Sequence, residues 1–500
     1  MSNVINENKR SQTAVSKYET LNKSYINGEW VEGKSQRSID ITDPYDQSVI
    51  TTVKPANVDQ IKQAFEAAKK AQKDWAKSTS KQRKEVLQKV KEYIERNKEE
   101  IIKIITRESG GTALKANLEI IITLDELQEA QKMVNEVYVP KEYPSFIPGK
   151  VNKVYRLPLG VITSITPFNF PMNLGARTIF PAIALGNSVV HKPDLQTGIT
   201  GGQIYAKAFE EAGLPAGVFN SILTDLEESG DEFLTNPNSP FISFTGSTAV
   251  GRHIGKVAGE HLKHLALELG GNSPVVVLSD ADVDRAVKAA VYGKYVHNGQ
   301  ICMSTNRIIV QRDVYNEFVE KFVAQVKGLK VGDPKNPETN IGPVINERQA
   351  DKIVGFIEQA KKDGLTVALE GKREGNVIHP YVFTDVPNNS TLAQTEIFGP
   401  VAQIIPAESD EEAIEFANAT QYGLSSAIFT SDLERAEKLA LEVEAGMTHV
   451  NDITVQAEAN VAFGGVKASG LGRFGHEWIA EEMTITKWIS VQKGARQYPF

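Results

Sequence analysis

Six short apolar runs decide the fold: VITSIT (161–166), NSVVHKP (187–193), GVFNSIL (217–223), FISFTG (241–246), HLALELG (264–270) and SPVVVL (273–278). Stretches with helical spacing separate most of these runs, and strands that alternate with helices at this interval are typical of βαβ units. Such units build a parallel sheet that is covered by helices on both faces. The predicted fold class is therefore α/β, and we expect ligands at the carboxyl ends of the strands.

The regions on either side of these runs complete the predicted organisation. Residues 58–107 and 117–136 repeat apolar residues at spacings of three and four between charges, which predicts amphipathic surface helices. Residues 140–158 contain four prolines and alternate apolar with polar residues, so an extended ribbon is expected there. From residue 279 to about 446 the αβ alternation begins again. Residues 486–494 have the character of a strand, which needs a sheet to join.

Length and composition restrict the class of protein. A chain of 500 residues is too long for one ordinary core, and 41% hydrophobic with 24% charged residues is the balance of a folded globular protein. The net charge is -8 without a basic stripe, so nucleic acid is not an expected partner. The polar N-terminus, the absence of an apolar run of ~18–20 residues and the single cysteine predict a cytoplasmic protein without a membrane partner.

Cys302 is the first candidate for a catalytic residue. It lies between a predicted helix and a predicted strand, where catalytic groups are often placed. An isolated cysteine is more often a buried structural residue. Its neighbours Gly299, Gln300 and 304–306 are small or polar, however, and favour a nucleophilic thiolate.

Glu268 and Asn169 are the next candidates. Glu268 lies in an apolar strand, where burial of a carboxylate is costly unless it is functional or paired in a salt bridge. Burial would also raise its pKa toward the range of a general base. Asn169 lies between a strand and a helix, so its amide could donate to an oxyanion. A lone asparagine beside prolines is also typical of a turn or an N-cap.

A nucleotide site is indicated by FISFTGSTAVGR, a predicted strand that ends near Gly246 and Ser247 and runs into a helix. Amide groups at a helix N-terminus bind phosphate. A G-x-G-x-x-G pattern occurs at Gly470, Gly472 and Gly475, but it follows no strand-like run and is predicted to be a loop. Neither a metalloprotease histidine motif nor a Walker motif is present, and no catalytic metal is expected.

Seven ordered motifs together resemble the aldehyde dehydrogenase family, and the resemblance covers nearly the whole chain. Glu268 and Cys302 have the family interval of 34 residues (302 minus 268), and the bacterial benzaldehyde and vanillin dehydrogenase group is the most similar. The motifs are PFNFP (167–171), KP (192–193), FTGS (244–247), LELGG (267–271), GQIC (299–302), EIFGP (396–400) and AFGG (462–465).

The resemblance implies a Rossmann-like parallel-sheet cofactor domain, an α/β catalytic domain and a small β oligomerisation ribbon. It places an NAD(P)-binding domain at residues 1–139 and 159–268 and a catalytic domain at 269–466. The oligomerisation elements are expected at 140–158 and 480–500. A homodimer or homotetramer is implied.

The resemblance also implies NAD(P)-dependent oxidation of an aldehyde to a carboxylic acid. Cys302 would attack the aldehyde carbon, and the Asn169 amide with the Cys302 backbone N–H would hold the oxyanion. Glu268 would then activate the water that hydrolyses the thioester. The cofactor would be NAD or NADP, and the implied cofactor-binding residues are Thr166, Pro167, Lys192, Leu195, Gly246, Ser247, Val250, Glu396 and Phe398.

Two features of the resemblance concern specificity. NAD-preferring relatives commonly carry glutamate where this chain has Leu195, so the use of both cofactors is expected. Aromatic rings expected in the substrate tunnel favour aromatic or bulky apolar aldehydes, although core packing explains these phenylalanines equally well. The implied tunnel residues are Phe168, Phe170, Asn173, Arg177, Met303 and Phe463.

Other interpretations stay open from the sequence. A semialdehyde or betaine-aldehyde type dehydrogenase is the main alternative, with Arg177 binding an anionic substrate end in the semialdehyde case. A thiol hydrolase is a further one, for which His297 is the only histidine near Cys302 in the sequence. A catalytically silent structural homologue is the last.

Overall fold

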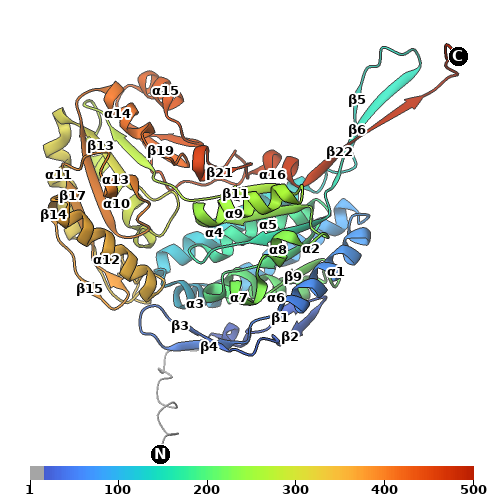
Figure 1. Cartoon of the computed structure of the whole chain (residues 1–500), viewed down its shortest axis with the longest axis horizontal. Coiled ribbons are helices and arrows are strands. Elements are labelled where there is room, and N and C mark those ends of the chain that lie inside the picture. The colour runs from blue at the N-terminus through green and yellow to red at the C-terminus, as the bar shows by residue number, and fades with distance from the viewer. Residues whose placement is uncertain (1–15) are drawn as a thin grey trace, which may run out of the picture.

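The computed structural model describes residues 16–500, which form two sheets of mainly parallel strands and a projecting ribbon (Figure 1). The predicted α/β fold class is confirmed. Residues 1–15 lie outside the described part, and they include most of the polar N-terminal segment on which the prediction of localisation drew. Among residues 16–500, no helix is both long and apolar enough to cross a membrane.

The first sheet contains five of the six apolar runs. Its strand order is β2-β1-β9-β8-β7-β10-β11-β21, and the pairs from β9 to β11 are parallel. The strands are β1 (Ser24–Ile26), β2 (Glu29–Val31), β7 (Val161–Ile165), β8 (Ser188–Lys192), β9 (Phe219–Ser221), β10 (Phe241–Thr245), β11 (His264–Glu268) and β21 (Gly470–Leu471).

Central strands of this sheet bury both of their faces. Val161 and Val190 pack into the core beside α1, whereas Ile162 and Val189 pack into the core beside α5. This alternation explains why the runs are apolar throughout. The helices around the sheet are α1 (Val58–Trp75), α2 (Ser80–Arg96), α3 (Lys98–Ser109), α4 (Ala113–Met133), α5 (Pro171–Ala184), α6 (Ile204–Ala212), α7 (Leu226–Ser229), α8 (Glu232–Thr235) and α9 (Thr248–Glu260).

The sixth run, SPVVVL, joins a second sheet, so the six runs do not form the single parallel sheet that their alternation with helices alone suggested. Its strand β12 (Pro274–Val277) lies between β13 and β19 in the order β14-β17-β18-β13-β12-β19-β20. An apolar run specifies a buried strand but not which sheet it joins. The other strands are β13 (Arg307–Gln311), β14 (Thr366–Leu369), β17 (Tyr381–Thr384), β18 (Val401–Ala407), β19 (Ser425–Phe429) and β20 (Met447–Val450).

Helices also cover both faces of the second sheet. Val275 and Val277 pack with α10 and α11, whereas Val276 packs with α12 and α14 on the opposite face. These helices are α10 (Val283–Tyr295), α11 (Arg312–Lys327), α12 (Glu347–Lys362), α13 (Thr391–Gln394), α14 (Asp410–Asn418) and α15 (Leu433–Glu442). Two short hairpins are β3 (Ile39–Thr42) with β4 (Val49–Val53) and β15 (Arg373–Glu374) with β16 (Val377–Ile378).

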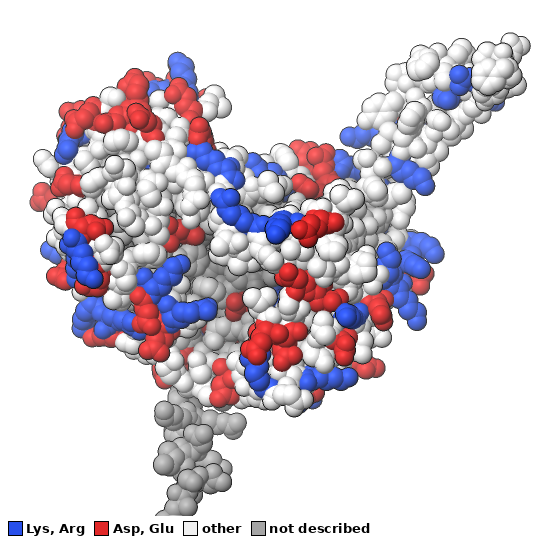
Figure 2. All heavy atoms as spheres, in the orientation of Figure 1, with Lys and Arg blue, Asp and Glu red and all other residues white. Residues whose placement is uncertain are grey.

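The predicted ribbon and the predicted last strand are confirmed, and they pair with each other. β22 (Thr484–Gln492) runs antiparallel to β6 (Lys150–Pro158) along its whole length, and β5 (Lys141–Tyr143) lies on the other side of β6. This three-stranded sheet projects from the body of the molecule (Figure 1). In the view of Figure 2 its surface is mainly uncharged.

The G-x-G-x-x-G segment is not only a loop, which corrects the prediction. Gly470 and Leu471 form β21, which pairs antiparallel with the end of β11 and brings Gly470 opposite Glu268. A Cβ on Gly470 would lie 2.4 Å from the Leu267 carbonyl oxygen, so only glycine permits this approach. The segment then leads into α16 (His476–Glu482).

Candidate active site

The carboxyl ends of four parallel strands bring the predicted site residues to one edge of the first sheet. β7, β8, β10 and β11 end at Ile165, Lys192, Thr245 and Glu268. Because these strands are parallel, the loops that follow them meet at the same edge. The loop at 166–170, which carries the predicted oxyanion donor, therefore lies beside the predicted base.

Cys302 lies half-buried after the 3-10 turn η4 (Val296–Gly299). Gly271 approaches it so closely that a Cβ there would lie 2.1 Å from the Cys302 carbonyl oxygen. Burial raises the pKa of Cys302 to about 12, and the charge of Arg177 acts in the opposite direction. The thiol therefore depends on nearby positive charge to ionise.

Glu268 is a buried carboxyl group without a hydrogen-bond partner for either oxygen among residues 16–500. A Cβ on Gly464 would lie 2.9 Å from its Oε1 atom, which shows how closely the backbone covers it. Burial raises the pKa of Glu268 to about 8, while the charges of Arg177 and Arg473 lower it. Such a group can take a proton from water near neutral pH.

Asn169 connects the loop after β7 to the cysteine loop. Its Nδ2 atom donates to the Gln300 carbonyl oxygen at 2.9 Å, and the side chain is buried. An amide carries two N–H donors, so one donor of Asn169 remains after this bond, and the accepting residue Gln300 stands two positions before Cys302 in the chain. This arrangement suits the stabilisation of an oxyanion.

His297 does not form a hydrogen bond with Cys302. Its ring packs edge-on against Phe170 with the centroids 5.7 Å apart, and within residues 16–500 neither ring nitrogen has a hydrogen-bond partner. Burial holds the pKa of His297 well below its ordinary value, so the ring is neutral. The cysteine–histidine pair that a thiol hydrolase needs is therefore not formed.

A phosphate site is available where β10 leads into α9. Ser247 is the N-cap of this thirteen-residue helix, and its hydroxyl accepts from the Val250 N–H at 3.4 Å. Ser247 and Val250 are exposed and Gly246 is half-buried, so the first amides of the helix face solvent. Anions bind at such a terminus because of its free N–H groups and the helix dipole.

The neighbouring predicted cofactor residues line the same edge of the sheet. The Thr166 N–H donates to the Lys192 carbonyl oxygen at 3.1 Å, which joins the ends of β7 and β8, and Pro167 is half-buried. The Thr166 hydroxyl is buried without a partner among the described residues. Leu195 is half-buried at the start of the 3-10 turn η2 (Leu195–Thr197).

Glu396 and Phe398 approach from the second sheet. The Glu396 Oε1 atom accepts from the Gly271 N–H at 3.0 Å, and a Cβ on Gly270 would lie 2.4 Å from Oε2. Phe398 has a positive φ of 54° and meets Phe168 edge-on with 6.0 Å between the centroids. A half-buried carboxylate, an exposed helix terminus and two facing rings together fit a dinucleotide.

The six expected tunnel residues are not equivalent in the structure. Phe168 is half-buried, whereas the other five are buried. The guanidinium of Arg177 lies between the rings of Phe463 and Phe474, at 4.6 Å from each centroid. Arg177 thus has internal partners, and one of them, Phe463, is itself an expected tunnel residue. The backbone N–H of Asn173 donates to Glu119 at 3.3 Å, and the Met303 carbonyl oxygen accepts from the Thr454 hydroxyl at 2.7 Å.

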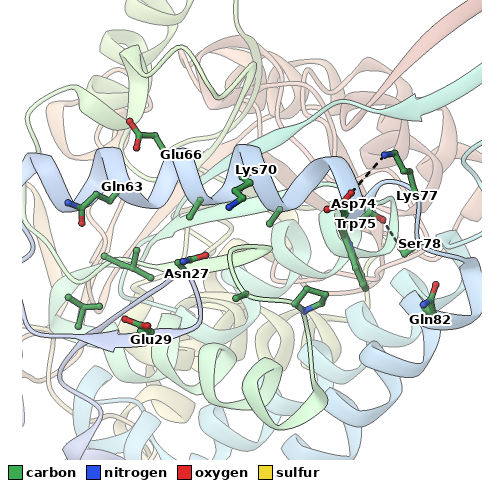
Figure 3. Close-up of a pocket in the computed structure, with 16 residues that line it drawn as sticks. Asn27, Glu29, Gln63, Glu66, Lys70, Asp74, Trp75, Lys77, Ser78 and Gln82 are labelled. Carbon is green, nitrogen blue, oxygen red and sulfur yellow. Dashed lines mark hydrogen bonds and ion pairs between the residues drawn. The ribbon is translucent and has the colours of Figure 1, made fainter.

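A large groove lies elsewhere on the molecule. It has a volume of about 940 Å³ and runs between α1 and the β1–β2 hairpin (Figure 3). Asn27 and Lys70 line it, and Asp74 pairs with Lys77 at its edge. None of the predicted site residues belongs to its lining. The candidate site is therefore the edge of the first sheet and not this groove.

The family model of the aldehyde dehydrogenases matches residues 30–489, which include the second sheet, the strands β7 to β11 and β21 of the first sheet, and most of the ribbon. The chain belongs to the aldehyde dehydrogenase family. Its site therefore combines the fold of this family with the thiol, carboxyl and amide groups described above.

Relatives of this aldehyde dehydrogenase match it over nearly its whole length. AldY of Bacillus subtilis is 62% identical over 483 residues, which are 97% of this chain and 100% of the relative. A vanillin dehydrogenase of Corynebacterium glutamicum is 46% identical over 94% of this chain and 98% of the relative. The crystal structure of an NAD-dependent benzaldehyde dehydrogenase from the same organism has a TM-score of 0.88 at 43% identity, covering 96% and 98% of the two chains.

Some residues of the dehydrogenase site were not expected from the sequence. Arg473 influences the pKa of Glu268, and Phe474 covers one face of Arg177. Both residues lie inside the G-x-G-x-x-G segment, between Gly472 and Gly475, so the glycines around them were the available signal. These glycines were considered only as a possible nucleotide-binding motif. Glycines also permit close backbone packing, which is their effect here.

Proposed function

We propose that this aldehyde dehydrogenase oxidises aromatic or bulky apolar aldehydes to carboxylic acids, with NAD or NADP as the oxidant. The observation that carries the proposal is the meeting of three groups: the only thiol of the chain, a buried carboxyl group without a hydrogen-bond partner in the described part of the chain, and an amide donor. Relatives named vanillin and benzaldehyde dehydrogenases support the class of substrate.

Each of these groups has one task in the proposed reaction. The Cys302 thiolate attacks the aldehyde carbon, and the Asn169 amide with the Cys302 backbone N–H holds the negative oxygen of the thiohemiacetal. A nicotinamide held beside Glu396 and Phe398 would supply the hydride acceptor that conversion of this thiohemiacetal to a thioester requires. Glu268 then removes a proton from water as the water attacks the thioester, which releases the acid and the thiol.

In this proposal the cofactor is held by residues at the edge of the first sheet and by Glu396 and Phe398, which approach from the second sheet. Lys192 binds the adenosine ribose, the amides beside Ser247 bind the pyrophosphate, and Glu396 binds the nicotinamide ribose. Phe398 packs against the nicotinamide side. Residues 1–139 and 159–268 then act as the cofactor domain, and residues 269–466 provide the catalytic cysteine.

A panel of aldehydes tests the class of substrate. We expect kcat/KM for benzaldehyde to exceed that for acetaldehyde by about a hundredfold, since each apolar group buried in a pocket contributes ~1–3 kcal/mol to the difference. The assay follows the absorbance of the reduced cofactor at saturating NAD. Acetaldehyde as the best substrate would contradict the aromatic preference but not the oxidation of aldehydes.

The structure also bears on the choice between NAD and NADP. Leu195 offers no charge to repel a 2′-phosphate, and the carboxylate of Asp194 caps η2 by accepting from the Gln196 N–H at 3.0 Å. NADP turnover at saturation is therefore expected to be more than a thousandth of NAD turnover. In the variant Leu195→Glu, kcat/KM for NADP should fall about a hundredfold, because facing like charges cost several kcal/mol. An unchanged NADP preference in this variant would contradict the role of position 195.

We also propose that the ribbon of β5, β6 and β22 joins copies of the chain in a homodimer or homotetramer. Apolar side chains on β22 are exposed, with Trp488 67% and Ile489 41% accessible. An exposed strand with apolar residues is a template for pairing with another chain. The ribbon projects from the body (Figure 1), and β22 is exposed along most of its length.

The variant Ile489→Asp is expected to weaken this assembly. A charge in a buried apolar interface lacks a partner, so the mass in solution should fall toward the 54.9 kDa of one chain. Light scattering after size-exclusion chromatography measures it. Leu441→Asp is the matched control, because Leu441 is 85% exposed on α15, away from the ribbon. A monomeric parent protein would refute the proposed assembly.

A further inference from the structure

Arg177 carries a buried positive charge that no structural ion pair accounts for. The residue is only 4% exposed, and among residues 16–500 its Nε atom has no hydrogen-bond partner. The rings of Phe463 and Phe474 cover the guanidinium, and its Nη2 atom donates to the Thr245 hydroxyl at 3.2 Å. Since burial of an unpaired charge is costly, the position calls for a function.

The partners of Arg177 flank Glu268 on two sides. Thr245 is the register partner of Glu268 in the parallel pair β10–β11. Phe463 immediately precedes Gly464, where a Cβ would lie 2.9 Å from the Glu268 Oε1 atom. The hydrogen bond to Thr245 and the contact with Phe463 therefore fix the guanidinium next to the carboxyl group.

Charged groups from several elements face this region. Arg177 lowers the pKa of both Cys302 and Glu268, whereas Glu268 and Glu396 raise the pKa of Cys302. The thiolate and the carboxylate thus oppose each other's ionisation. The groups that face one another are Glu126 on α4, Arg177 on α5, Glu268 on β11, Cys302 before β13, Glu396 before β18 and Arg473 before α16.

We propose that Arg177 is a positioning residue, whose clamped guanidinium provides the fixed positive charge that lets the Cys302 thiolate and the Glu268 carboxylate exist side by side. This inference rests on the proposed function. Arg473 is less suited to the task, because its Nη1 atom is committed to the Gly465 and Gly472 carbonyl oxygens at 2.9 and 2.7 Å. Arg177 acts on both groups and therefore supports both the attack and the hydrolysis.

The same geometry argues against a direct contact of Arg177 with an anionic substrate end. A carboxylate binds arginine through two parallel N–H donors in the guanidinium plane. Here the rings of Phe463 and Phe474 cover the guanidinium, one Nη atom is engaged by Thr245, and the side chain is buried. An electrostatic effect on Cys302 and Glu268 does not require that a substrate reach the guanidinium.

Alkylation of Cys302 with iodoacetamide tests the inference independently of turnover. Cys302 is the only cysteine of the chain, so the rate of alkylation reports this thiol alone. In Arg177→Met we expect the pH midpoint of alkylation to rise by about one unit, which is a tenfold lower rate at a fixed pH below the midpoint. Arg177→Lys keeps the charge and should restore most of the shift. The pH midpoint of benzaldehyde turnover should move in the same direction.

The controls separate charge from folding and from substrate binding. Arg83→Met removes another buried arginine, whose Nη2 atom donates to the Val134 carbonyl oxygen, and it should lower stability without moving the midpoint. An unmoved midpoint in folded Arg177→Met, or a loss confined to carboxylated aldehydes, would overturn the inference. If the parent protein did not oxidise aromatic aldehydes, the proposed function would fail while the alkylation result stood.

Discussion

Replacement of Cys302 by alanine is expected to lower the turnover of benzaldehyde by at least about 10⁴-fold, as removal of a catalytic nucleophile does in enzymes with covalent intermediates. The sulfur forms the only bond between protein and substrate in the proposed reaction, and water cannot take its place beside the nicotinamide. The initial rate of cofactor reduction at saturating benzaldehyde and NAD measures the effect.

Binding and folding should survive this substitution. Cys302 is half-buried in a loop whose shape is set by the backbone contact with Gly271, and the contact does not involve the sulfur. Thermal unfolding and NAD affinity are therefore expected to stay close to those of the parent. Aldehyde oxidation at the parental rate by a folded Cys302→Ala protein would end the proposal of a thiol mechanism.

Much of this site follows from the sequence because parallel strands carry their loops to one edge. The runs at 161–166, 241–246 and 264–270 are apolar enough to be buried strands, and Asn169 and Glu268 stand at or just beyond their ends. Once these strands are parallel, the two side chains must lie near each other. No such rule places Cys302, and the resemblance to a known family was needed for it.

What the sequence did not show depends on contacts between distant segments. SPVVVL is as apolar as its neighbours, and only its partners β13 and β19 assign it to the second sheet. The guanidinium of Arg177 lies over Phe463 and Phe474, which stand nearly three hundred residues later in the chain, and no local pattern predicts these contacts. The pairing of β21 with β11 has the same origin, since no local pattern encodes it.

Replacement of Glu268 by glutamine is expected to block the second half of the reaction and to leave the first half intact. Steady-state turnover should fall by about 10² to 10⁴-fold, the range for loss of a general base. One equivalent of reduced cofactor per active site should still appear rapidly, because Cys302 and Asn169 remain in place. Stopped-flow absorbance separates this burst from the slow phase.

The raised pKa of Glu268 also predicts how turnover changes with pH. Burial raises the pKa of Glu268 to about 8, so parental turnover limited by hydrolysis should increase up to about pH 8 and then level off. In the Glu268→Gln variant turnover should not show this rise with pH. A carboxyl group whose pKa is raised by folding costs stability progressively as pH rises from its ordinary value of 4.5 toward 8.

The thermal stability of the Glu268→Gln variant also distinguishes a catalytic base from a carboxylate that holds the fold together. The variant Glu268→Gln should unfold at a temperature similar to the parent at acidic pH and at a higher one at pH 9, because neither oxygen of Glu268 has a hydrogen bond to lose within the described residues 16–500. A structural salt bridge would give the opposite result, with the variant less stable at pH 9. Loss of the burst, by contrast, would show that Glu268 is already needed before the thioester forms.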